Sequence, residues 1–405
     1  MDSSSAGATV GGGAIQRAER ILVVDDIEDN RELLIRRLRR EGFSDIATAA
    51  DGAEALKHIA REPCDLVLLD VMMPHVDGYQ VLERLRADGR LHELPVIVIS
   101  ALNEIDSVVR CIQLGAVDYL PKPFNATLLR ARVGATLEQK KLRDQVRAHL
   151  ARLEQELAAA RALQMSMVPT DFPAPDAGRD VEIFATMEPA REVGGDLYDF
   201  FFTPDGRLAF LIGDVSGKGV PAAMFMARTL NLLRVICGFL LRDGGAATPG
   251  EIIARVNREL SAGNTTMTFV TLFFGVLDPQ NGALAFCNAG HDPPFRLAKG
   301  AATPLVGAQG LALGIDETWS YESGTATLEP GETLCLSTDG ITEANDPAQA
   351  LFGKERLAAL LASQDAAPLD ALIGGIVAAV KAFAQDTPQA DDITVLALRR
   401  RASGA

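Results

Sequence analysis

The chain has 405 residues, and at ~100 to 200 residues per domain this length indicates two or three domains rather than one small module. Hydrophobic residues make up 48% and charged residues 23%, which allows a buried core and excludes a largely disordered chain. The formal net charge of −15 argues against a general binder of nucleic acid or anionic membranes. Clustered carboxylates, in contrast, can hold divalent cations.

The cysteines and the apolar runs indicate a cytoplasmic protein. The five cysteines are scattered without a C-x-x-C pair, which is typical of reduced thiols. The longest near-apolar run, Ala371 to Val380, is far shorter than the ~18 residues that span a bilayer. The N-terminal residues lack the basic start and apolar stretch of an export signal. We therefore expect no membrane insertion.

The first regular pattern follows a flexible tail, residues 1–18, rich in Ser, Gly and Ala. Over residues 19–136, short apolar runs alternate with amphipathic segments of helix length. Five strands with intervening helices predict a doubly wound parallel α/β sheet, whose functional groups gather at the carboxyl ends of the strands.

Polar residues stand directly after or at the end of these apolar runs: Asp25, Asp26, Asp70, Ser100 and Lys122. A single strand-end Asp is often a helix cap, but five such groups in this order are hard to explain as caps. Three converging carboxylates need a neutralising cation, and hard oxygen ligands suit Mg²⁺. A carboxylate nucleophile beside a cation, a hydroxyl and a lysine can accept a phosphoryl group.

This segment resembles a response-regulator receiver domain. The resemblance rests on the D-D after the first strand, on D-V-M-M-P-H-V-D-G around Asp70 and on the terminal K-P-F. It implies that Asp70 is the phosphoacceptor and that Asp25 and Asp26 hold Mg²⁺. It further implies that Ser100 and Lys122 contact the phosphoryl group, that Tyr119 is the aromatic switch residue, and that the Lys122-Pro123 bond is commonly cis.

A helical linker is predicted next, at residues 137–168, because residues 125 to 165 contain no proline and are rich in helix-forming residues. Apolar residues recur in steps of four and three at Val146, Leu150, Leu153, Leu157 and Ala160. This is the spacing of a coiled-coil seam, although it lasts only about two heptads. The pattern supports a helical connector more firmly than it supports a dimer.

The remaining domain, residues 169–401, is predicted to be α+β, followed by a tail at 402–405. Its apolar runs are mostly strand-like, with helical stretches near 220–241, 249–262, 354–362 and 368–385. The D-P-Q-N-G turn between Val276 and Leu284 has hairpin spacing. We therefore expect antiparallel sheets flanked by helices.

Acidic clusters also mark the strand ends of this domain: Asp196 with Asp199, Asp214, Asp339, and Asp391 with Asp392. Such clusters can build a binuclear cation site, in which the metals lower the pKa of a water and stabilise an in-line displacement. His291 can be a metal ligand, a general acid or a turn histidine, and the last is favoured because no second histidine lies at metal-binding spacing.

These motifs resemble the PPM-type metal-dependent serine/threonine protein phosphatases, in the bacterial branch that controls stress-response and sporulation sigma factors. The resemblance runs from A-R-A-L-Q-M-S-M-V-P to D-D-I-T-V-L-A-L. It implies two Mn²⁺ or Mg²⁺ ions held by six groups: Asp196, Asp214, Asp339, Asp391, the carbonyl of Val215, and Asp392 as the less certain member of its pair. Arg191 lies near the place of a phosphate-binding arginine.

The sequence thus leads to a hypothesis of a two-component protein in which phosphorylation of Asp70 controls a serine/threonine phosphatase. The expected partners are a sensor histidine kinase or phosphotransfer protein, a phosphorylated anti-sigma-factor antagonist as substrate, and a second copy of the chain through receiver and linker helix. The alternative is a non-catalytic adaptor, which the loss of metal-ligand carboxylates would mark. A transcription factor is disfavoured because neither a helix-turn-helix pattern nor a basic C-terminal domain follows.

Overall fold

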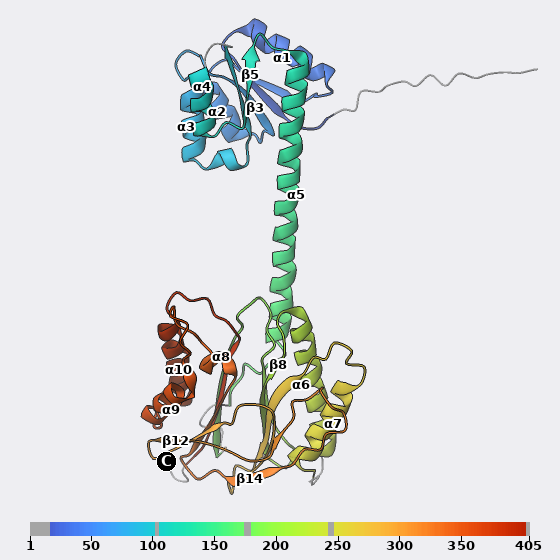
Figure 1. The fold of residues 1–405 in the computed structure, drawn as a ribbon, viewed down its shortest axis with the longest axis vertical. Helices are drawn as coiled ribbons and strands as arrows, with labels where there is room; N and C mark the ends of the chain where they lie inside the picture. The colour runs from blue at the N-terminus through green and yellow to red at the C-terminus, as the bar shows by residue number, and fades with distance from the viewer. Residues whose placement is uncertain (1–16, 102–104, 174–179, 242–246, 402–405) are drawn as a thin grey trace, which may run out of the picture. The chain divides into compact units, whose positions relative to one another are not determined.

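The computed structural model describes residues 17–101, 105–173, 180–241 and 247–401. The chain divides into two compact units, Met1–Arg152 and Leu153–Ala405. Helix α5 (Ala126–Met165) begins in the first unit and ends in the second (Figure 1).

The first unit contains one parallel sheet of five strands in the order β2-β1-β3-β4-β5. The strands are β1 (Ile21–Val24), β2 (Ile46–Ala49), β3 (Leu66–Asp70), β4 (Val96–Ala101) and β5 (Asp118–Lys122). Every residue of β1 and the apolar residues of β3 are fully buried, because helices cover both faces of the sheet. This is the predicted doubly wound architecture.

The helices on the two faces are α1 (Glu28–Arg40), α2 (Gly52–Arg61), α3 (Gly78–Ala87), α4 (Ile105–Leu114) and the first turns of α5, with a 3-10 turn η1 (Arg90–His92) after α3. Leu34 of α1 and Leu129 of α5 share one core. Ala55 of α2 and Val81 of α3 lie in the other. Asp51 and Asp77 cap α2 and α3 by accepting backbone N–H groups, so these two acids have structural roles.

Helix α5 runs for 40 residues without interruption, as its proline-free sequence predicts. Leu137 is buried against the first unit, and Gln164 is buried in the second. Along the stretch 138–163, all of which is described, no side chain is buried.

The second unit packs two mainly antiparallel sheets face to face around a large apolar core. One sheet has the order β13-β10-β9-β8-β7, with β14 paired to β10, and the other has the order β12-β11-β15-β16-β6. The strands are β6 (Val181–Glu188), β7 (Leu197–Phe202), β8 (Leu208–Val215), β9 (Val270–Leu277), β10 (Ala283–Ala289), β11 (Phe295–Ala298), β12 (Ala301–Pro304), β13 (Gln309–Gly310), β14 (Gly324–Thr327), β15 (Thr333–Ser337) and β16 (Ile393–Arg400). The predicted hairpin is present, with Leu277 opposite Leu284.

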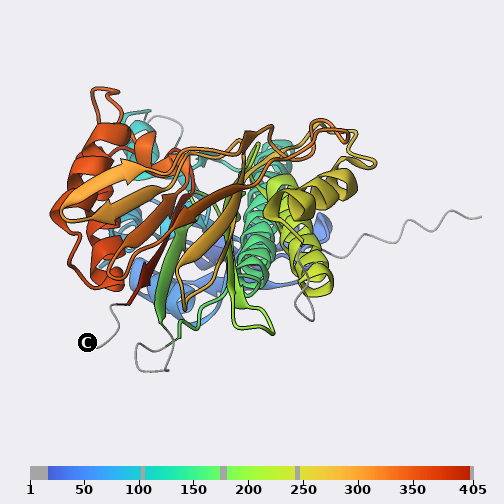
Figure 2. The ribbon, with the colours of Figure 1, turned by 90° about the horizontal axis from the view of Figure 1, so that it is seen from below.

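Helices cover the outer face of each sheet (Figure 2). Helices α6 (Val220–Leu240) and α7 (Pro249–Ser261) lie on the β8 sheet, and α9 (Gly353–Ser363) and α10 (Leu369–Ala384) lie on the β16 sheet. The short helix α8 (Asp339–Thr342) follows β15. The helices therefore form close to the four predicted stretches, and the α+β prediction is confirmed.

Among the described residues, α6 alone has the length and composition of a helix that could cross a bilayer. Seven of its residues, including Phe225, Leu230 and Leu233, are buried in this unit. The sequence predicts a helix near residues 220–241 but no membrane segment there. Core helices of water-soluble domains share its length and apolarity.

Candidate functional site: two carboxylate clusters

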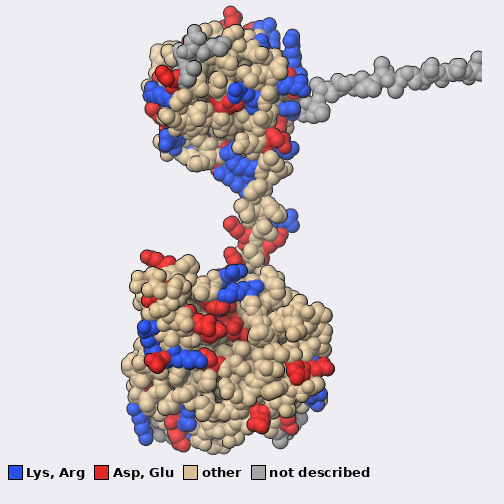
Figure 3. All heavy atoms as spheres, in the orientation of Figure 1, with Lys and Arg blue, Asp and Glu red and all other residues tan. Residues whose placement is uncertain are grey.

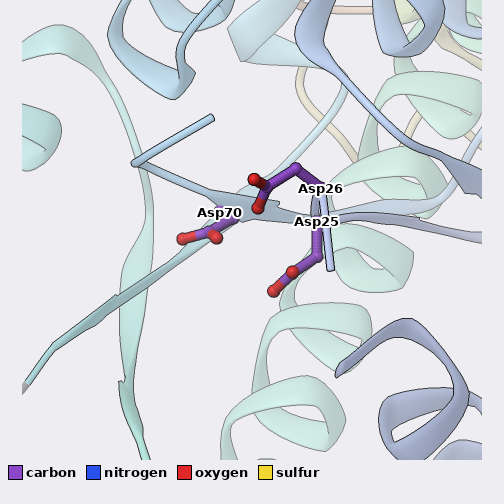
Figure 4. A group of neighbouring side chains, drawn as sticks. All are labelled: Asp25, Asp26 and Asp70. Carbon is purple, nitrogen blue, oxygen red and sulfur yellow. The ribbon is translucent and has the colours of Figure 1, made fainter. Parts of the chain in front are cut away.

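The parallel sheet brings the first predicted site together at the carboxyl ends of its strands. Asp25 follows β1, and Asp70 is the last residue of β3, the neighbouring strand. Asp25 and Asp70 are buried, whereas Asp26 is exposed. One carboxylate oxygen from each of the three lies within 4.8 Å of the others, and the side chains face a common space (Figure 4).

Lys122 at the end of β5 reaches into this cluster. Its Nζ donates to Asp70 Oδ2 at 2.7 Å and to Asp25 Oδ2 at 3.0 Å. Asn30 of α1 donates to both oxygens of Asp25 at 3.0 and 3.1 Å, which fixes that carboxylate from the other side. The ammonium thus stands beside the carboxylate that the sequence identifies as phosphoacceptor.

The charges of this site affect one another. Burial raises the pKa of Asp70, and the hydrogen bond and charge of Lys122 oppose that rise. Burial by itself lowers the pKa of Lys122, but its bonds to Asp70 and Asp25 leave the pKa above its ordinary value. Lys122 is therefore charged at neutral pH and can stabilise negative charge on a group bound to Asp70.

The other receiver residues named from the sequence lie on the neighbouring strands. Ser100 is buried at the end of β4, next to β3. Tyr119 of β5 is 37% exposed, and the guanidinium of Arg132 lies over its ring at 4.7 Å. The Lys122-Pro123 bond is cis, as expected.

In the second unit, four carboxylates at strand ends lie near enough for the charge of Asp214 to interact with those of the other three. Asp196 directly precedes β7, Asp214 lies near the end of β8, Asp339 begins α8 after β15, and Asp391 precedes β16. Strands β7 and β8 belong to one sheet, and β15 and β16 belong to the other. Figure 3 shows acidic side chains gathered in a hollow on one face of this unit.

Asp196 is the most deeply placed of the four, with 2% of its surface exposed. Its Oδ2 accepts hydrogen bonds from the hydroxyls of Thr338, at 2.8 Å, and Thr394, at 2.5 Å. Thr394 N–H in turn donates to Thr338 Oγ1 at 3.1 Å. The hydroxyl of Thr394 in β16 and that of Thr338, which follows β15, thus hold a carboxylate that directly precedes β7 of the other sheet.

Burial and nearby negative charge raise the pKa values of three of these carboxyls, Asp196, Asp214 and Asp339. Burial, then the charge of Asp214, raises the pKa of Asp196 well above its usual value, against the two threonine hydrogen bonds. Burial, followed by the charges of Asp339 and Asp391, raises the pKa of Asp214 to about 7. The pKa of Asp339 rises to about 6, chiefly through burial. The site therefore concentrates negative charge that a cation would neutralise.

Two glycines allow the backbone to approach this site closely. A Cβ on Gly195 would lie 2.8 Å from the carbonyl oxygen of Val215, and one on Gly340 would lie 1.9 Å from the carbonyl oxygen of Asp392. The Val215 carbonyl is thus next to the backbone before Asp196. Together with four carboxylates, this makes a set of hard oxygen donors that fits Mn²⁺ or Mg²⁺.

Asp391 and Asp392 point to different partners although they are adjacent. Asp391 forms an ion pair with Lys218 at 2.9 Å. Asp392 is buried, and its carboxylate accepts the backbone N–H groups of Ala190 at 2.8 Å, Gly195 at 2.7 Å and Asp196 at 3.3 Å. In this arrangement Asp392 holds the loop that carries Asp196.

The other residues of the sequence reading have separate surroundings. Asp199 is fully buried and pairs with Arg234 of α6, whose Nε lies 2.5 Å from Oδ2. Arg191 is exposed. His291 is buried, its backbone N–H and carbonyl are bonded to the side chain of Asn288, and its Nδ1 lies 3.2 Å from Thr271 Oγ1. The side chain of Asn288 thus satisfies the backbone groups of His291 in this turn.

Sequence reasoning gave no role to Lys218 or Gln164. Lys218 lies in the short G-K-G segment and binds Asp391, so its cationic group stands among the acidic residues. Gln164 lies at the end of α5 and contacts Gly194 in the loop before Asp196. A lysine between two glycines could have been noticed, but nothing in the sequence links residue 164 to residue 194.

Comparison with known proteins identifies both units. The family model "Response regulator receiver domain" matches residues 21–134, and the model "Stage II sporulation protein E (SpoIIE)" matches residues 204–401. Protein IcfG of Synechocystis sp. is 34% identical over 274 residues, which cover 60% of this chain and 41% of IcfG. Response regulator MprA of Mycobacterium ulcerans is 45% identical over 125 residues, 31% of this chain and 53% of MprA.

Among solved structures, the SiaA-PP2C domain of Pseudomonas aeruginosa matches with a TM-score of 0.55 and 25% identity, over 62% of this chain and 98% of that domain. The chain spans about half the length, or less, of the two curated relatives named above. The parallel sheet with its acidic cluster and the paired antiparallel sheets agree with these matches. Residues 21–134 are therefore a response-regulator receiver domain, and residues 204–401 lie in a phosphatase domain of the SpoIIE, PP2C type.

Proposed function

We propose that phosphorylation of Asp70 controls a Mn²⁺- or Mg²⁺-dependent phosphatase that removes phosphate from phosphoserine or phosphothreonine on a partner protein. The observation that carries the proposal is the buried carboxylate of Asp196, which hydroxyls from the other sheet region hold beside Asp214 in a hollow lined by acidic side chains. Such a site is costly without a cation and is suited to phosphate chemistry with one.

In the receiver, an oxygen of Asp70 forms the new bond to phosphorus while the bond to the phosphodonor breaks. Asp25 and Asp26 would hold Mg²⁺, since one carboxylate oxygen of each lies within 4.8 Å of an oxygen of Asp70. Lys122, already 2.7 Å from Asp70, neutralises charge on the transferred group. Ser100 contacts the phosphoryl group and Tyr119 responds to it, as the family resemblance implies.

In the phosphatase, the residues that would hold two cations are Asp196, Asp214, Asp339, Asp391 and, through its carbonyl, Val215. When bound, they lower the pKa of a water and neutralise the phosphate. Thr338 and Thr394 favour the ionised form of Asp196 through their hydroxyls. Arg191 is exposed, which would leave its guanidinium free to meet a phosphate.

The proposed domains are the receiver at 19–136, the helical linker at 137–168 and the phosphatase at 169–401. The match to the SpoIIE model supports a phosphorylated anti-sigma-factor antagonist as substrate, and the receiver match supports a sensor histidine kinase or phosphotransfer protein as donor. We place this activity in the cytoplasm. A non-catalytic adaptor remains the alternative, and the presence of all four carboxylates favours the enzyme.

A homodimer through receiver and linker helix is also part of the proposal. Val146, Leu150 and Leu153 of the seam are 59%, 53% and 40% exposed in the single chain. Burying these side chains against a second copy would stabilise a pair of helices. Sedimentation of the wild type and of the double variant Val146→Glu/Leu150→Glu tests this, and a wild type that stays monomeric at micromolar concentration would contradict it.

The test of the function is Mn²⁺-dependent hydrolysis of an aryl phosphate and a phosphoserine peptide by the full chain, with and without beryllofluoride as a mimic of the Asp70 phosphoryl group. Activity that requires metal and changes with beryllofluoride supports both sites and their coupling. Metal-dependent activity that does not change with beryllofluoride would support the phosphatase assignment and contradict control by Asp70. No activity on these substrates or on a phosphorylated antagonist supports the adaptor.

A further inference from the structure

Lys218 brings a positive charge to the carboxylates of the second unit. Its Nζ lies 2.9 Å from Asp391 Oδ2, and among the ion pairs of the described residues this is the only one made by the four carboxylates of the site. The charge of Asp391 in turn raises the pKa values of Asp214 and Asp339, so these three carboxylates act on one another. Figure 3 shows basic side chains on the rim of the acidic hollow.

The segment that carries Lys218 is held at both ends. Before it, the N–H of Ser216 donates to the carbonyl of Phe269 at 2.8 Å, and Ser216 Oγ accepts the N–H of Phe269 at 3.0 Å. After it, the carbonyl of Gly219 accepts a backbone N–H of the first turn of α6 at 3.0 Å. The backbone of Lys218 is therefore fixed shortly after Val215, a predicted cation donor, while 39% of its side chain stays exposed.

The ammonium of Lys218 can change partners without moving its backbone. Its two partners, the carboxylate of Asp391 and the carbonyl of Ala390, belong to the segment before β16. The Asp391 side chain is 35% exposed, and a pair of partly exposed charges is held together only weakly. A cation held by Asp391 would neutralise the charge that attracts the ammonium. Lys218 could then turn to another anion on the same rim.

The charge of the loaded site indicates which anion this would be. Four carboxylates and two divalent cations cancel, so the site by itself has no net charge to offset a phosphoryl group that carries about −1.5 to −2 at neutral pH. An ammonium on the rim supplies part of the missing positive charge and three hydrogen-bond donors. Arg191 is exposed, but no described hydrogen bond or ion pair links it to the carboxylates. Lys218 is thus the better placed of the two cations.

We propose that Lys218 binds a phosphoryl oxygen of the phosphoserine or phosphothreonine substrate, and that Asp391 holds the ammonium until cations occupy the site. This inference rests on the proposed function and adds a substrate-binding residue to it. If Lys218 only held the segment at Ala390 in place, its removal would weaken cation binding. If it binds the substrate, its removal takes a positive charge away from a cation ligand and does not weaken cation binding.

The experiment compares the full-length protein with its variants Lys218→Met, Lys218→Arg and the control Lys381→Met, all in an Asp26→Asn background that weakens the receiver site. Methionine keeps an unbranched side chain without the charge, and arginine restores the charge and its donors. Lys381 is 58% exposed and pairs with Glu188 at 2.6 Å, so the control removes an ion pair that involves none of the four carboxylates. Because the Lys218 side chain is partly exposed, its variants should fold.

Two binding measurements do not depend on turnover. The first is the affinity for Mn²⁺ alone, measured by electron paramagnetic resonance. The second is the affinity of the Mn²⁺-loaded protein for inorganic phosphate, measured by the relaxation of the phosphorus nucleus beside the paramagnetic ion. A third measurement gives kcat and KM separately for hydrolysis of a phosphoserine peptide.

We expect Lys218→Met to weaken phosphate binding about tenfold, as the loss of a hydrogen bond between charged groups implies, and to lower kcat/KM by at least that factor. Its Mn²⁺ affinity should equal or exceed that of the parent protein. Lys218→Arg should recover most of the phosphate affinity, and Lys381→Met should match the parent protein.

A Lys218→Met protein with unchanged phosphate affinity would overturn the inference and leave the proposed function standing. The same holds for a Lys218→Met protein whose Mn²⁺ binding is weakened as much as its phosphate binding, because that result assigns Lys218 a structural role. A parent protein that binds no Mn²⁺ in the phosphatase unit refutes the proposed function itself, and the inference falls with it.

Discussion

The hydroxyl of Thr394 provides the sharpest test of the phosphatase site. Thr394 is fully buried, and its hydroxyl donates to Asp196 Oδ2 at 2.5 Å. The variant Thr394→Val keeps the branched shape that suits a strand and removes only the donor. Because the hydrogen bond lowers the pKa of Asp196, its loss must raise that pKa further.

A hydrogen bond to a charged group contributes about 1.5–3 kcal/mol. At about 1.4 kcal/mol per factor of ten, its loss makes the ionised form of Asp196 about ten- to a hundredfold less favourable. The remaining hydroxyl of Thr338, at 2.8 Å, can take over part of this role, so the lower end of the range is expected. A cation must displace the proton from Asp196, and we therefore expect about tenfold weaker binding near neutral pH and a shift of the binding midpoint to higher pH.

The assay is Mn²⁺ affinity measured by calorimetry from about pH 5.5 to about pH 8.5, a range that covers the raised pKa values of the site. Thr333→Val is the matched control, because Thr333 is equally buried at the start of β15 and its hydroxyl accepts a hydrogen bond from Arg399 instead. A Thr394→Val protein with the same pH midpoint as the wild type would refute the idea that this hydroxyl keeps Asp196 ionised.

Four further predictions concern both units. Asp214→Asn should abolish Mn²⁺-dependent hydrolysis with the fold retained, as circular dichroism would show; normal turnover contradicts the assignment. The pKa of Asp214 is raised to about 7, so the metal-free folded protein keeps a proton on Asp214 that the unfolded chain releases above about pH 4. Protonation of Asp214 therefore contributes its full stability below about pH 4. This stability is lost as the pH rises toward 7. Without metal, the melting temperature of the wild type should therefore fall relative to that of Asp214→Asn between about pH 4 and about pH 7. A difference that stays constant over this range would contradict the raised pKa of Asp214. Asp70→Asn should remove the change in phosphatase rate caused by acetyl phosphate or beryllofluoride, and a persisting change would disprove the receiver role. Gly194→Ala should lower the free energy of unfolding by about 1–3 kcal/mol, and with it the urea midpoint, because the new Cβ would lie 2.1 Å from Asp392. The control Gly134→Ala in α5, where a Cβ would meet nothing within 4 Å, should leave the midpoint unchanged. Equal midpoints for the two variants would refute the close packing at Gly194.

The sequence predicts most of the architecture because the signals are local. The strand-end acids Asp25 and Asp70 meet because parallel neighbouring strands end at one edge, which is a general property of this fold. The limits of α5 follow from the absence of proline over 125–165, and the β9–β10 hairpin follows from its turn residues. Strand β7 is not predicted from the sequence, because Leu197–Phe202 has an acidic residue inside its apolar run.

The roles of adjacent acids could not be separated in this way. Asp196 and Asp199 share one motif, yet Asp199 pairs with Arg234 on a helix thirty-five residues away. Asp391 and Asp392 are neighbours, yet one meets Lys218 and the other accepts backbone N–H groups. Which acid faces the site depends on packing between elements. A contact made to backbone groups, as at Gly194, cannot be predicted from the residue type of the partner.

The crowding of carboxylates in the second unit has a consequence for the lifetime of the protein. A cation that binds only the folded state stabilises it by about 2.7 kcal/mol at one hundred times its dissociation constant, so the open population that a protease cleaves falls about a hundredfold. Supply of the metal would then set not only the rate of the enzyme but how long each molecule survives. Proteolysis by thermolysin, with and without Mn²⁺ and with Asp214→Asn as control, measures this directly: protection of the wild type alone is expected, and equal half-lives would contradict it.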